Sequence, residues 1–174
     1  MAINSSGAST EFSLTLHYGV LNLITDRTKA DVERVRYLAA KGWANMTEEE
    51  RNEWLDGLKG AYNTTDLNRV GAAVEYVVGR FGELGYVVSC EVKKNWEQSN
   101  FPDEAQTENY LNSISYVRSL VPVFKTTPEV PEDMSGLTYV EANNIEKILL
   151  DVNKIADNIT ASWYYSGELL SGEV

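Results

Sequence analysis

Three stretches of this chain open with one five-residue pattern that is typical of the first turn of a helix. Each has an acid, an apolar residue, Asn or Glu, a polar residue and then a β-branched apolar residue. The copies begin at Asp31, Asp66 and Glu141, and the third is the loosest. An acid suits the positive end of a helix dipole, and the apolar residues start a buried stripe. Because the copies are unevenly spaced, they exclude a regular solenoid and predict separate helices.

Capping residues and glycines mark the ends of the predicted helices. Thr28 and Thr47 are each followed three residues later by an acid, which is the arrangement of a capping box. In the second helix we expect Trp54, Leu55 and Leu58 to face inward. The predicted helices span residues 29–41, 48–59, 65–84, 102–120 and 138–162.

Two short runs have the apolar pattern of strands. Phe12, Leu14, Leu16 and Tyr18 alternate with polar residues, and residues 86–92 form a brief β-prone run. The predicted fold is therefore mainly α, with about five helices and a small β element from the N-terminal strands; an α+β fold is the alternative. Its segments are a flexible N-terminus (1–10), a short β segment (11–26), a helical domain (27–121), a proline-containing connector (122–136), and a long C-terminal helix with an aromatic tail packed on the same domain (137–174).

The last predicted helix carries apolar residues at alternating spacings of three and four. They are Ile145, Ile148, Val152, Ile155 and Ile159. β-branched residues at both core positions of a heptad favour trimers or larger bundles, so this stripe is a candidate partner-binding surface. A helix packed inside its own domain has the same stripe, and that interpretation stays open.

Aromatic residues supply the remaining candidate contacts. Trp163, Tyr164 and Tyr165 form a strand-like tail that the core must cover or a partner must bind. Trp96 lies in a polar loop, where its ring is a candidate for stacking on a sugar. The aromatic residues therefore predict either docking on other subunits or binding of a glycan.

The charge balance restricts the partners. The chain has 15 basic and 26 acidic residues and a formal net charge of −11, which disfavours nucleic acid and anionic membranes as partners. No apolar run reaches transmembrane length, so we expect no membrane insertion. The first ten residues lack the basic and apolar regions of a signal peptide.

No residues have the spacing of a catalytic or metal site. Cys90 and His17 are the chain's single cysteine and single histidine, and they lie far apart in sequence. Glutamates 48–50 point in different directions on a helix and suit a charged first turn. We therefore predict that the protein is not an enzyme and that it holds no cofactor and no metal.

Residues 66–70 and 137–148 resemble segments of proteins from tailed phages and prophages of Firmicutes. The second stretch has the form L-T-x-x-x-x-N-x-I-E, which commonly opens a helix in tail, baseplate and fibre proteins of this kind. The resemblance extends over residues 24 to 168. It implies a structural component of the virion, made in the bacterial cytoplasm, whose partners are other phage structural subunits or copies of itself. The alternative is a module that binds a host-surface glycan or receptor, although this chain lacks the long β-rich shaft of a fibre.

Overall fold

The computed structural model describes residues 21–97 and 102–170 of the chain. In order, they form α1 (Lys29–Lys41), the short 3-10 helix η2 (Trp43–Asn45), α2 (Glu48–Asp56), α3 (Thr64–Glu83), α4 (Glu104–Ser119) and α5 (Tyr139–Leu170). These two ranges contain no strand, and the prediction of a mainly α fold is confirmed. The predicted strand over residues 12–18 lies outside the described residues, and residues 22–28 have no regular secondary structure.

Side-chain caps explain where the helices begin. In each of five capping boxes, the side chain of the residue before the helix accepts a hydrogen bond from the backbone N–H of the third helical residue. The side chain of that third residue in turn accepts a hydrogen bond from the backbone N–H of the capping residue. The pairs are Thr28–Asp31, Thr47–Glu50, Asn63–Asp66, Asp103–Gln106 and Thr138–Glu141. The expected starts of α3 at Thr65 and of α4 at Pro102 are wrong by one or two residues. Asn63 and Asp103 supply the oxygen that caps the free N–H groups there.

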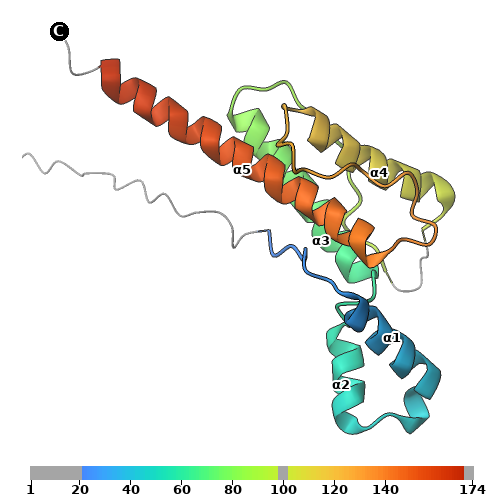
Figure 1. The fold of residues 1–174 in the computed structure, drawn as a ribbon. Coiled ribbons are helices and arrows are strands. Elements are labelled where there is room, and N and C mark those ends of the chain that lie inside the picture. The colour runs from blue at the N-terminus through green and yellow to red at the C-terminus, as the bar shows by residue number, and fades with distance from the viewer. Residues whose placement is uncertain (1–20, 98–101, 171–174) are drawn as a thin grey trace, which may run out of the picture.

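The three long helices α3, α4 and α5 pack against one another and run in the same direction (Figure 1). Near its start, α3 contacts the early part of α5 through Arg69 and Glu146. Near its end, α3 contacts the later part of α5 through Arg80 and Asp157. Successive helices that run the same way need long return connections. The connectors that contain residues 84–97 and 120–138 provide them.

The core lies where these three helices meet, and side chains from both connectors complete it. Its fully buried apolar members are Val70, Val74, Val77 and Phe81 from α3, Ile114 and Val117 from α4, and Ile145, Ile148, Leu149, Val152 and Ala156 from α5. Trp96 and Val121 add to it from the connectors. Each helix thus buries one stripe, as its apolar spacing predicts.

The connector after α3 is extended but is not a strand, so the predicted strand over residues 86–92 is wrong. Val88, Cys90 and Val92 pack partly buried against the core, while Val87, Ser89 and Glu91 between them are exposed. An extended chain with one face on a helical bundle has the same period of two as a half-buried strand. The alternating apolar residues of this connector therefore reflect burial of one of its sides, and they do not indicate pairing in a β-sheet.

Helices α1 and α2 form a hairpin that extends from one end of the bundle (Figure 1). Leu38 and Met46 are its buried apolar side chains, and Arg34 pairs with Glu53 across the two helices. The sequence predicts that Trp54 and Leu55 face inward, but they are 37% and 71% exposed. That expectation is wrong because the hairpin stands away from the bundle that would have covered α2.

Candidate partner-docking surface

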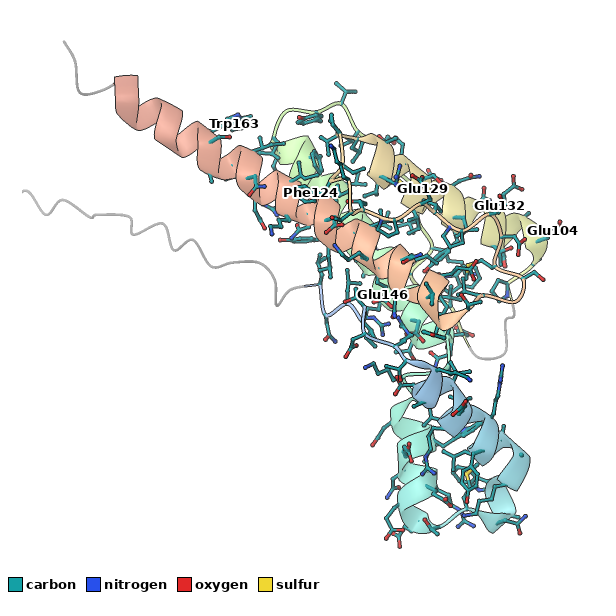
Figure 2. The ribbon with its side chains drawn as sticks, in the orientation of Figure 1. Glu104, Phe124, Glu129, Glu132, Glu146 and Trp163 are labelled. Atoms are coloured by element: carbon teal, nitrogen blue, oxygen red, sulfur yellow. The ribbon has the colours of Figure 1, made fainter. Side chains whose placement is uncertain are left out.

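Buried charges fix the start of α5. Glu146 is fully buried and accepts hydrogen bonds from Arg27 at 2.6 Å and from Arg69 at 2.8 Å. Asp66 of α3 pairs with the same two guanidinium groups. Two cations and two carboxylates therefore neutralise one another away from water, as buried charges must. Figure 2 marks Glu146 on the early part of α5, where this network joins α5 to α3 and to the segment before α1.

Arg69 of this network and the neighbouring residues Tyr62 and Tyr110 have pKa values raised above their ordinary ones. Burial acts to lower the pKa of Arg69, but its hydrogen bonds and charge interactions with Glu146 and Asp66 outweigh burial and raise that pKa. The hydroxyl groups of Tyr62 and Tyr110 lie 2.6 Å apart, and burial raises the pKa of both phenols. This cluster of ionised and neutral groups joins the helices together.

The predicted partner-binding stripe divides into two parts along α5. Ile145, Ile148 and Val152 are fully buried in the core that α5 shares with α3 and α4. Ile155 and Ile159 are partly buried and pack at the edge of that core. The first three residues thus face their own chain, as the alternative interpretation of the stripe held.

The C-terminal part of α5 leaves the bundle. Arg80, near the end of α3, pairs with Asp157 at 2.6 Å, and α5 then continues to Leu170. At 1.5 Å per residue, the part of α5 after Asp157 extends about 20 Å beyond this level. Figure 1 shows this projecting end, which we define as residues 160–170, running past the ends of α3 and α4.

Trp163 is an exposed aromatic residue of the projecting end. Its side chain is 55% exposed, and Figure 2 shows it beyond the body of the bundle. The expectation of a strand-like tail is wrong, because Trp163, Tyr164 and Tyr165 continue the helix. The side chains of Tyr164 and Tyr165 lie outside the described part of the structure. Of the predicted contact residues whose side chains are described, Trp163 is thus the one that lies open on the surface.

Trp96 does not form an exposed aromatic platform. Its side chain is only 5% exposed, and its backbone exchanges two hydrogen bonds with the side chain of Asn68 on α3. The ammonium group of Lys93 lies 4.0 Å from the centre of its ring. The glycan-binding hypothesis therefore loses the residue on which it rested.

Sequence reasoning missed an exposed aromatic surface on the hairpin. Tyr37 and Trp43 are exposed there, together with Trp54 and Leu55. Arg34 and Lys41 lie over the ring of Tyr37, which is a common way to cover an aromatic face. The small size of this two-helix unit was the available signal, because it cannot bury all its large side chains.

Two cavities lie beside α4, and the acidic residues in their linings decide whether they resemble a glycosidase active site. One, of about 640 Å³, lies between residues 90–96 and α4, and the other, of about 580 Å³, lies between the hairpin and the bundle. Each has a single acidic residue in its lining, Glu91 in the first and Glu97 in the second. Glycoside hydrolysis uses a facing pair of carboxylates, which neither lining contains.

Among the described residues, neither a metal-binding cluster nor a membrane-spanning helix is found. Within residues 21–97 and 102–170, no three side chains of His, Cys, Asp or Glu are grouped so that they could hold a metal ion. No helix in the same ranges combines the length and the apolar character that crossing a bilayer requires.

The described residues form a parallel three-helix bundle with a hairpin at one end and a projecting helix at the other. Comparison with known proteins found no matching family model, no matching curated protein and no matching solved structure.

Proposed function

We propose that this protein is a non-enzymatic structural component of a phage tail or baseplate that docks onto neighbouring subunits through the projecting end of α5. The observation that carries this proposal is the exposed Trp163 on a helix that has left its own core. The phage setting rests on the resemblance of residues 66–70 and 137–148 to phage structural proteins.

The energetics of the projecting end favour docking. The projecting end continues an existing helix and runs past the ends of α3 and α4, and because helices in proteins gain most of their stability from packing, this end gains when a partner covers it. Tryptophan is also among the residues that contribute most to protein interfaces when buried there. Trp163 is therefore a suitable anchor residue for a partner that binds the end of α5.

Light scattering on the full-length chain tests this proposal. The molar mass should be measured alone and after co-expression with the structural proteins encoded by neighbouring genes. We expect a self-assembled species or a complex with one of these proteins. Trp163→Ala should weaken that association by about tenfold or more, because interface tryptophans commonly contribute over 1 kcal/mol.

Trp43→Ala is the matched control, since Trp43 is a similarly exposed tryptophan on the hairpin. It should leave the association unchanged. The proposal fails if the chain is monomeric and binds none of the co-expressed proteins. It also fails if Trp163→Ala and Trp43→Ala behave alike.

A further inference from the structure

A cavity of about 340 Å³ lies between α1 and the start of α5, apart from the projecting end. One face of α1 contributes Lys29, Val32 and Arg36, which are spaced three and four residues apart. The remaining lining residues are Arg27, Gly60, Tyr62, Gly136, Leu137, Thr138, Tyr139 and Ala142. The cavity is thus built at the junction of the hairpin and the bundle.

The charge of the lining is unusual for this acidic protein. Arg27, Lys29 and Arg36 line the cavity, and no acidic residue does. Arg27 is neutralised by the buried network, but Lys29 has only a loose contact of 3.5 Å with Glu33. Arg36 has no ion pair or hydrogen bond within the described ranges. Among the described residues, Arg36 is therefore the cation of this lining that no carboxylate pairs with, and the lining itself contains no acidic side chain.

Two carboxylates in the first turns of α1 and α5 do not line the cavity, and each is held by hydrogen bonds in the cap of its own helix. Asp31 accepts hydrogen bonds from Thr28, and Glu141 accepts them from Thr138. Each carboxylate serves the first turn of its own helix.

Hydrogen-bond donors accompany the positive charge. Arg27 is nine-tenths or more buried and its Nε is itself shielded, so the accessible side-chain donors of the lining are those of Lys29 and Arg36. Tyr139 lines the cavity, and its backbone N–H, in the first turn of α5, has no acceptor within the helix. Such groups favour a negatively charged oxygen.

We propose that this cavity is a binding site for a small organic anion, a carboxylate or phosphate group carried on an apolar body. Lys29 and Arg36 attract and hold the anionic group. The side chains of Val32, Leu137 and Ala142 line the rest of the cavity and contact the apolar part. The cavity volume lies in the lower range of small-ligand sites and exceeds the space that a bare phosphate ion needs.

Calorimetric titration of the full-length chain tests this inference with three probes. Phenyl phosphate and phenylacetate carry the two anionic groups on the same ring, and inorganic phosphate is the anion alone. We expect saturable binding of one or both aromatic probes, tighter than that of inorganic phosphate. The probe that binds best identifies whether the site takes phosphate or carboxylate.

Arg36→Gln should weaken binding of the preferred probe by about fivefold, the effect of removing one partly exposed charge contact. Lys154→Gln is the matched control, because Lys154 is an exposed cation on α5 that does not line the cavity. Equal melting temperatures would show that both variants fold.

Three results would overturn the inference: no saturable binding of any probe, equal affinity for all three probes, or equal weakening by Arg36→Gln and Lys154→Gln. None of these results depends on Trp163, so this site and the docking function stand or fall separately.

Discussion

Arg27 and Glu146 lie 2.6 Å apart with both side chains shielded from water, and this pair fixes the start of α5 against the segment that leads into α1. The backbone of Arg27 also exchanges hydrogen bonds with the side chain of Asn143, one turn earlier on α5. Side-chain and backbone contacts therefore position the hairpin at the same end of the bundle.

We predict that Glu146→Gln strongly destabilises the fold. The substitution leaves Arg27 and Arg69 buried with Asp66 as their only nearby carboxylate in the network. Removing one partner of a buried ion pair costs about 3–5 kcal/mol. Urea denaturation of the wild type and the variant measures this loss as a change in the free energy of unfolding.

Glu129→Gln provides the control for this prediction. Glu129 pairs with Arg118, but its side chain is 85% exposed. Exposed pairs contribute about 0–1 kcal/mol, so this variant should stay close to the wild type. If Glu146→Gln costs no more than Glu129→Gln, the buried network does not stabilise the fold as argued.

Two glycines of α3 should respond in opposite ways to substitution by alanine. A Cβ at Gly71 would lie 2.6 Å from the carbonyl oxygen of Lys93, whereas a Cβ at Gly79 would meet nothing within 4 Å. Gly79→Ala should raise the free energy of unfolding by about 0.5–1 kcal/mol through helix propensity. Gly71→Ala should lower it by about 1–3 kcal/mol, because the connector must move.

Thermal and urea denaturation of both alanine variants check this pair of predictions. Each variant changes the same residue type within one helix, so intrinsic propensity is matched between them. A stabilising Gly71→Ala would show that residues 90–96 do not pack closely on α3.

The Glu141 carboxylate should make stability depend on pH. Its hydrogen bonds with the backbone and side chain of Thr138 lower its pKa below the usual 4.5. Because the pKa is lower in the folded state, the stabilisation is present at neutral pH and is lost as pH falls through the folded value. Glu141→Gln should therefore be less stable than the wild type at pH 7, with the gap closing in acid.

Urea denaturation of the two proteins from pH 7 down to about 3 measures that gap. Thr138→Ala removes the hydroxyl donor but keeps the backbone N–H, which is the larger cause of the lowered pKa, so it should flatten the pH dependence only in part. A gap of constant size across this range would mean that the charge of Glu141 does not act through the cap.

The sequence predicted the helix starts well because caps are local. Thr28, Thr47 and Thr138 each meet an acid three residues later, and that spacing is visible in the sequence. The Arg27–Glu146 pair is different, since its members come from distant segments and have no shared local pattern. The parallel orientation of α3, α4 and α5 also could not be predicted, because it depends on contacts between segments that are distant in the sequence.

The candidate site was predicted in part. The sequence singled out Trp163, but aromatic content alone suggested a strand there. The helix continues because nothing from Tyr139 to Trp163 breaks it, and adding a residue to an existing helix is easier than starting a new element. Trp96 was misplaced because its burial depends on Asn68, which is distant in sequence.

The final prediction concerns the dynamics of α5. Backbone amides of residues 145–156 should exchange hydrogen slowly, since side chains on this part of the helix are buried between α3 and α4. Amides of residues 160–170 should exchange much faster in the dilute protein, because this end of the helix runs past the ends of α3 and α4. Hydrogen–deuterium exchange with mass spectrometry resolves the two regions, and repeating it at high concentration or with a docked subunit should slow exchange in the second region alone. Equal protection along the whole of α5 in the monomer would show that the projecting end is stable without a partner, and it would remove the energetic argument for docking.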